Sequence, residues 1–246
     1  MERPEIRQVL ESHLDEEDYT ACSTCQTLDE LIPLAEALLA RQQHIDTVLE
    51  LGCGRGGLTA GFADLLSCGS VHGIDRDEGR LAVATSRGVT THRLDLATEV
   101  LPFDDGSVDL VLSFGFFEHL CSFDHPLAES RRVLGDDGFA LHAVPNLASL
   151  VNRIALLCGN QPRDVEISEQ GAFGIARWYG KGDVLGHPHA PTHDAFVELL
   201  EHHGFVVDDV VGLFPYQHAW YVTLADRLTS VRPTLARRIA VLAHTD

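Results

Sequence analysis

The sequence predicts an α/β protein built on an open, doubly wound and mostly parallel sheet. Short apolar runs alternate with segments of helical periodicity between residues 47 and 145, as parallel strands joined by helices do. The clearest unit begins with Thr47–Leu51, a buried-strand pattern with one carboxylate, followed at once by a glycine-rich loop at 52–57 and an apolar helical pattern. A strand, a glycine turn and a helix bring backbone amides and a helix N-terminus against a ligand.

The other elements are predicted from periodicity and from turn signals. Upstream, we expect a helix at 2–14, and residues 27–30 match a capping box that begins a second helix. The acidic run at 15–18 is interpreted as a solvated face. Downstream, the predicted strands are 71–75, 89–94, 108–114, 139–144, 205–213 and 238–243, and the predicted helices are 58–66, 78–86, 126–134, 147–158, 193–203 and 218–230. A Gly-Asp-Asp-Gly turn at 135–138 should separate helix from strand.

Charge limits the classes of partner. The 246 residues include 18 Lys and Arg against 37 Asp and Glu, which gives a net charge of -19, and Lys181 is the single lysine. Such a surface repels nucleic acid and anionic membranes, so we expect neither partner. We find no signal-like segment and no apolar run of the roughly 20 residues that span a bilayer, so we expect a cytoplasmic protein. The acidic, lysine-poor composition predicts a halophilic source, because salt screens self-repulsion.

Three interpretations of the glycine loop are open. Gly52, Gly54 and Gly57 fit the G-x-G-x-x-G pattern of dinucleotide sites. Glu50, with Gly52, Gly54 and Gly56, fits a different pattern, acidic-x-G-x-G-x-G. A carboxylate is unfavourable beside a pyrophosphate and favourable beside a cationic amino group, which points to S-adenosylmethionine with its ammonium and sulfonium. The third interpretation is a tight strand–helix turn without a ligand.

A second acid lies at the end of the next predicted strand. Asp75 closes the strand 71–75, where an acid can accept hydrogen bonds from both ribose hydroxyls of an adenosine. The alternative is that Asp75 caps the helix 78–86. We favour the ribose interpretation because position and residue type agree.

Four stretches together resemble the class I S-adenosylmethionine-dependent methyltransferases, in the small-molecule branch with the quinone-type and glycolipid-type enzymes. The stretches are V-L-E-L-G-C-G-R-G from 48, G-I-D from 73, L-D-L from 94 with L-P-F-D-D-G-S-V-D-L-V from 101, and F-E-H-L from 117 with R-V-L-G-D-D-G-F from 132. The resemblance implies a Rossmann-like seven-stranded sheet of order 3-2-1-4-5-7-6 with helices on both faces. It implies one domain over 1–246, with N-terminal helices (1–46), a cofactor-binding core (47–145), an acceptor-side helix, loop and cap (146–203) and an edge hairpin (204–246).

The resemblance also assigns cofactor contacts residue by residue. Glu50, Gly52, Cys53 and Gly54 would line the methionyl end of S-adenosylmethionine, Asp75 and Arg76 the ribose, Asp95 and Leu96 the adenine, and Ser113 and Phe114 the sulfonium. Aromatic faces attract a cation by about 0.5–2 kcal/mol, which suits the last of these contacts.

His119 is the candidate catalytic residue. The protein must hold the acceptor atom in line with the methyl group, and a general base is needed only when the acceptor is a hydroxyl or a similar acid. His119 can act as that base because neutral imidazole is available near pH 7. The alternative is that His119 caps a helix and packs on the adenosine edge. We interpret Glu118 as a structural residue that orients the loop.

Residues outside the core have two interpretations each. The apolar stripe at 147–158 either packs over the sheet, which we favour, or forms a lid over an apolar acceptor. The glycine-rich stretch 159–182 is expected to be a functional loop. His187, His189 and His193 could meet a metal ion, but we favour a loop lining the acceptor pocket and assign no metal. The lone C-x-x-C at 22–25 is interpreted as a plain turn.

The expected function is methyl transfer to a small-molecule acceptor, at oxygen. Sequence motifs of nucleic-acid base methylation are missing, and the acidic surface argues the same way. One alternative is an S-adenosylmethionine-binding partner subunit or regulator without turnover. The other is a nicotinamide-dependent oxidoreductase, which gives no reason for Glu50. The sequence leaves the oligomeric state open.

Overall fold

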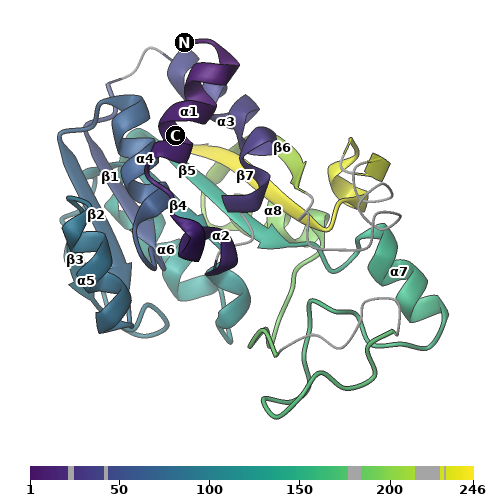
Figure 1. Cartoon of the computed structure of the whole chain (residues 1–246). Helices are drawn as coiled ribbons and strands as arrows, with labels where there is room; N and C mark the ends of the chain where they lie inside the picture. The colour runs from purple at the N-terminus through teal and green to yellow at the C-terminus, as the bar shows by residue number, and fades with distance from the viewer. Residues whose placement is uncertain (22–24, 42–43, 177–183, 214–227, 230) are drawn as a thin grey trace.

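A seven-stranded sheet forms the centre of the computed structural model, which describes residues 1–21, 25–41, 44–176, 184–213, 228–229 and 231–246. The strand order is β3-β2-β1-β4-β5-β7-β6, as predicted (Figure 1). The strands are β1 (Thr47–Leu51), β2 (Ser70–Asp75), β3 (Thr90–Arg93), β4 (Val108–Phe114), β5 (Leu134–Pro145), β6 (Phe205–Leu213) and β7 (Arg238–Thr245). β1 pairs in parallel with β2 and β4, whereas β7 pairs antiparallel with β5 and β6 and completes the predicted edge hairpin.

Helices cover both faces of this sheet. They are α1 (Arg3–Ser12), α2 (Glu16–Ala21), α3 (Leu28–Ala40), α4 (Gly57–Leu66), α5 (Glu78–Ser86), α6 (Asp124–Val133), α7 (Leu150–Leu157) and α8 (His193–His202). α1, α3 and α4 share a hydrophobic cluster with Val48, while α6 and α8 share another with Leu49. Neighbouring β1 residues point to opposite faces because side chains alternate along a strand. This two-sided burial explains why the central strands read as continuous apolar runs.

The N-terminal region differs from prediction in two respects. α3 begins at Leu28, but the expected cap residue Thr27 ends a 3₁₀ turn (Cys25–Thr27) and its side chain makes no capping bond. The acidic run is not simply solvated, because Asp18 is buried and lies 2.8 Å from Arg87. A buried carboxylate needs such a cationic partner.

The predicted turn between α6 and β5 is part of the strand instead. β5 begins at Leu134 directly after the helix, and its register against β4 shifts between Val108 and Leu110. Asp137 has a φ of 61°, so the extra residues are accommodated in a left-handed conformation. The Gly-Asp-Asp-Gly sequence therefore forms an irregularity within β5 rather than a separate turn.

The apolar stripe of α7 is exposed, so the packing interpretation is wrong for most of it. Leu157 is 86% and Ile154 is 44% exposed. The buried face carries Ala155 and Asn152, whose amide donates to Asp164 at 2.9 Å. Figure 1 shows α7 on the opposite side of the molecule from β3 and α5. Helical periodicity identifies an apolar stripe but does not say whether another element covers it.

Two predictions about the chain ends fall partly or wholly outside the described ranges. The helix expected at 218–230 lies almost entirely outside them, and so does Cys22 of the C-x-x-C. Within the described ranges, no helix has the length and apolar character needed to cross a bilayer.

Candidate functional site

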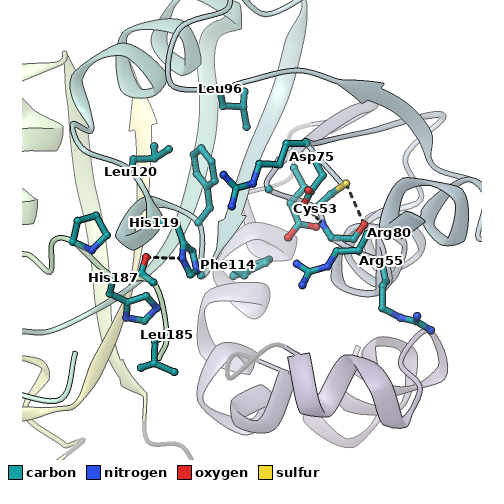
Figure 2. A pocket seen from close by; sticks show the side chains of 18 of the residues that line it. Cys53, Arg55, Asp75, Arg80, Leu96, Phe114, His119, Leu120, Leu185 and His187 are labelled. Atoms are coloured by element: carbon teal, nitrogen blue, oxygen red, sulfur yellow. Dashed lines mark hydrogen bonds between the residues drawn. The ribbon is translucent and has the colours of Figure 1, made fainter. Parts of the chain in front are cut away.

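A cavity of about 1310 Å³ opens at the carboxyl ends of β1, β2 and β4 (Figure 2). Its walls are the glycine loop, the ends of the strands, the loop after β4, and two later segments at 166–170 and 184–188. β1 and β4 are adjacent strands at which the strand order reverses. Open α/β sheets bind ligands at this reversal point.

The glycine loop takes backbone conformations that favour glycine. Gly52 has a φ of +68°, and a Cβ added there would lie 2.8 Å from the ring of Phe116. Gly54 has a φ of +52°, and a Cβ there would meet no atom within 4 Å. The absence of a side chain at Gly52 therefore lets Phe116 approach the backbone, and at Gly54 it leaves the cavity open.

Glu50 is a buried carboxylate in the cavity wall. It lies in β1, is 3% exposed, and accepts a hydrogen bond from the hydroxyl of Thr59 on α4. A carboxylate at such a depth is favourable only when hydrogen bonds or a positive charge compensate for lost hydration.

Asp75 fastens the glycine loop to the end of β2. Its carboxylate accepts the Gly54 N–H at 3.0 Å and the Asp77 N–H at 2.9 Å. The N-cap of α5 is Asp77, whose side chain accepts the Arg80 N–H at 3.0 Å. The alternative role of Asp75 as the helix cap is therefore wrong. Both of its oxygens keep further lone pairs for a ligand in the cavity.

The remaining predicted contacts of the ribose and the adenine also line this cavity. Arg76, Asp95 and Leu96 are all in its wall. Leu96 is buried, whereas Asp95 is exposed and accepts the Ala97 N–H at 3.0 Å. Leu96 thus supplies an apolar surface beside the Asp95 carboxylate, as expected for a pair that contacts an adenine ring.

Cys53 lines the cavity as a protonated thiol. It lies between the glycines, and burial raises its pKa well above the ordinary range, helped by the charges of Glu50 and Asp75. A thiol in this state is a poor nucleophile. Cys53 is therefore poorly suited to covalent chemistry and contributes an uncharged side chain to the cavity wall.

Ser113 is the predicted site residue that the structure does not bring into the cavity. It is fully buried, and its hydroxyl lies 2.8 Å from Nδ1 of His142. The next residue, Phe114, does line the cavity and stacks on Phe62 with 5.6 Å between ring centroids. Consecutive side chains of β4 point to opposite faces, and of these two that of Phe114 is the one in the cavity wall.

His119 lies at the other end of the cavity, in the 3₁₀ turn Phe117–His119 (Figure 2). Its Nδ1 is 3.1 Å from the carbonyl oxygen of Gly186, and its ring is 4.8 Å from that of His187. A carbonyl can only accept, so Nδ1 donates, and in the neutral ring Nε2 keeps its lone pair. Glu118 is buried and pairs with Arg238 at 3.0 Å, which agrees with a structural role.

The three histidines considered for a metal diverge. His187 is buried beside His119, and burial lowers its pKa below the ordinary value. His189 is exposed, and Nδ1 of His193 lies 2.7 Å from the carboxylate of Asp194. Across the described part of the chain, no group of three or more His, Cys, Asp or Glu residues is arranged to hold a metal ion.

Comparison with known proteins identifies the fold. Residues 49–142 match the methyltransferase domain family. A solved S-adenosylmethionine-dependent methyltransferase from Methanosarcina mazei superposes with a TM-score of 0.60 at 17% identity, covering 85% of this chain and 96% of that one. The chain has the class I methyltransferase fold. The fold class and the strand order predicted from the sequence are therefore confirmed.

Curated relatives match this chain over part of their length. One, from Geobacter sulfurreducens, is a malonyl-[acyl-carrier protein] O-methyltransferase, 31% identical over 137 residues that make up 54% of this chain and 50% of the relative. Another, from Mycolicibacterium smegmatis, is named "Probable S-adenosylmethionine-dependent methyltransferase" and is 32% identical over 169 residues, 68% of this chain and 54% of the relative. The chain thus spans about half the length of these relatives.

A cluster of ion pairs joins the N-terminal acidic run to the glycine loop, and it was not predicted from the sequence. Arg55, in the loop, lies 2.7 Å from Asp15 and 3.4 Å from Asp18, and Arg87 lies 2.7 Å from Asp15. The hydrogen bond from Arg55 lowers the pKa of Asp15 to about 2. Asp18 and Arg55 both line the cavity. The signal was available in the acidic run, but nothing local indicated its distant partners.

Phe116 is a further residue of the cavity that was not predicted from the sequence. It lines the cavity beside Gly52 and packs against Phe117 with 5.3 Å between ring centroids. Its place in the aromatic run after β4 was the available signal. Because its ring touches the glycine loop, Phe116 is better placed than Ser113 to face a cationic ligand.

Proposed function

We propose that this chain is an S-adenosylmethionine-dependent methyltransferase that methylates a small-molecule acceptor at oxygen. The observation that carries the proposal is that Glu50, Asp75 and Asp95 line one cavity together with the glycine loop. A positively charged donor bearing an adenosine matches three acids in this order. The family match over 49–142 and the named relatives support the same reaction class.

The residues present fit S-adenosylmethionine. The glycine loop offers an open backbone cradle at Gly54, and the buried carboxylate of Glu50 would compensate an ammonium. Asp75 would accept the ribose hydroxyls, and Asp95 with Leu96 would take the adenine. Phe114 and Phe116 supply aromatic faces in the same wall. Bound there, the cofactor supplies a methyl group on a sulfonium, which is already an excellent leaving group.

The cavity supports binding of a donor and an acceptor together. Its volume of about 1310 Å³ exceeds the roughly 300–1,000 Å³ typical of a site for one small ligand. The segments 166–170 and 184–188 line the end beyond the glycine loop, where an acceptor would bind. Holding the two reactants in line is the main catalytic task of the protein in a displacement of this kind.

His119 is proposed as the base that takes the proton of an acceptor hydroxyl. Its Nδ1–H donates to Gly186, which leaves the Nε2 lone pair as the proton acceptor. Burial lowers the pKa of the adjacent His187, which favours its neutral form beside His119. Positioned bases of this kind contribute about 10²–10⁴-fold to a rate.

Calorimetry with S-adenosylmethionine tests the donor assignment. Asp75→Asn should weaken binding by more than about a hundredfold, because hydrogen bonds to a charged group contribute about 1.5–3 kcal/mol each and two ribose hydroxyls are involved. Asp77→Asn is the matched control, since it lies two residues away, caps α5 and is not in the cavity wall. Equal affinities for the two variants, or no binding by the wild type at millimolar donor, would contradict the proposal.

Turnover needs a separate measurement. Incubation with methyl-labelled S-adenosylmethionine and a small-molecule extract, followed by mass spectrometry, should yield a labelled product with an O-methyl group. His119→Ala should lower its rate of formation without changing donor affinity. Donor binding with no labelled product would instead favour the partner-subunit alternative.

A further inference from the structure

Glu166 holds the backbone of the segment that faces His119. Its carboxylate accepts the N–H groups of Leu185 and Gly186, both at 2.6 Å, and of His187 at 3.4 Å. In return, the Glu166 N–H donates to the His187 carbonyl at 2.9 Å. One side chain and one amide therefore fix three successive residues at the far end of the cavity. Hydrogen bonds to a carboxylate are stronger than those between neutral groups.

Gly186, the middle residue of this segment, provides the hydrogen-bond acceptor for His119. The Gly186 N–H is bound to Glu166 while its carbonyl accepts from His119 Nδ1 at 3.1 Å. Gly186 has a φ of +74°, a left-handed conformation that side chains disfavour. The direction of the Gly186 carbonyl thus depends on the glycine conformation and on the clamp from Glu166.

The ring of His187 restricts the orientations that the His119 ring can adopt. The two rings stand edge to face at an interplanar angle of 75°. His187 is 7% exposed and its backbone belongs to the same clamped segment. His119 is therefore bounded by a ring on one side and by a carbonyl at Nδ1.

We propose that Glu166 is a positioning residue that sets the tautomer of His119. By fixing the Gly186 carbonyl, Glu166 keeps the neutral imidazole in its Nδ1–H form and directs the Nε2 lone pair to the acceptor hydroxyl. The hydrogen bonds of a neutral imidazole set which of its nitrogens is protonated, and a backbone carbonyl at Nδ1 favours the proton there. This inference rests on the proposed role of His119 as the base, although the tautomer itself is measurable without an acceptor.

Nuclear magnetic resonance of ¹⁵N-histidine-labelled protein, in mildly alkaline buffer where histidine is neutral, tests the proposal. The His119 signals among the 14 histidines are assigned from their loss in His119→Ala. Wild type should show Nδ1–H. Glu166→Gln, which has one acceptor oxygen and adds an NH₂ donor, should lower the ratio of Nδ1–H to Nε2–H by roughly fivefold, the effect of one hydrogen bond of ordinary strength.

Two further variants make the test specific. Gly186→Ala disturbs the same carbonyl through the backbone and should also lower the ratio. Glu169→Gln removes an exposed carboxylate of the same cavity wall and should leave the wild-type ratio unchanged. An Nε2–H tautomer in the wild type, an unchanged ratio in Glu166→Gln, or equal changes in Glu166→Gln and Glu169→Gln would each overturn the proposal.

Donor affinity measured on the same samples separates this inference from the proposed function. If the wild type binds S-adenosylmethionine but its His119 tautomer does not depend on Glu166, the positioning role fails and the methyltransferase assignment stands. If the tautomer depends on Glu166 and the donor does not bind, the assignment fails while the clamp is confirmed.

Discussion

Acid should destabilise this protein through His142, which lies in β5 behind the candidate site. His142 is fully buried, with the rings of Phe117 and Phe196 at 5.2 and 6.4 Å and the Ser113 hydroxyl at Nδ1. Burial lowers the pKa of His142 from the ordinary 6.5 to about 3. The folded protein therefore excludes a proton that the unfolded chain accepts below pH 6.5.

The sign and size of the effect follow from proton linkage. Because the unfolded state binds more protons, the free energy of unfolding falls as the pH drops below 6.5 and continues to fall until the folded histidine titrates near pH 3. The slope approaches about 1.4 kcal/mol per pH unit, so His142 alone removes about 2 kcal/mol between pH 7 and pH 5. Burial also lowers the pKa of His72 and His92, which adds loss in the same direction.

Urea unfolding at pH 7, 6 and 5 measures this loss. His142→Asn keeps an acceptor for the Ser113 hydroxyl but removes the titration, so its unfolding free energy should fall by about 2 kcal/mol less than that of the wild type over this range. His44→Asn, at a side chain that is 82% exposed, is the control and should run parallel to the wild type. A His142→Asn curve that is also parallel to the wild type would refute the reasoning.

Two other predictions concern the glycine loop. Gly54→Ala should lower the free energy of unfolding by about 1–2 kcal/mol, because residue 54 has a left-handed φ. The same variant should weaken S-adenosylmethionine binding by more than about tenfold, because the new methyl group enters the cavity. Calorimetry that finds unchanged affinity would speak against a donor on this loop. Cys53 should react with a thiol reagent far more slowly than exposed Cys121 at mildly alkaline pH, because its pKa is raised by burial and nearby carboxylates. Rapid labelling of Cys53, located by peptide mass spectrometry, would show that the loop opens in solution.

The sheet and most of the candidate site were predictable because their signals are local. A buried parallel strand is a run of apolar residues, and the acids at the strand ends are adjacent to those runs in the sequence. The sequence alone therefore predicts that Glu50, Asp75 and Asp95 lie at one edge of the sheet. The cavity wall includes all three.

The errors arose where the outcome depends on distant parts of the chain or on the direction of a side chain. The resemblance assigns Ser113 and Phe114 one role, but Ser113 bonds to buried His142 while Phe114 lines the cavity. The acidic run at 15–18 shows only its own charge locally, whereas its partner Arg55 comes much later in the chain. The stripe of α7 had the correct period, yet periodicity carries no information about what covers it.

The two ends of the cavity are built from different parts of the chain, and this has an evolutionary consequence. The acids and glycines predicted to contact the cofactor lie within residues 49–142, the segment that matches the domain family, whereas the far wall comes from 166–170 and 184–188. In that wall, hydrogen bonds from the N–H groups of Leu185 and Gly186 to Glu166, and not strand pairing, hold the two segments together. The far wall can therefore change in sequence and shape without altering the strands or the glycine loop that form the opposite end of the cavity.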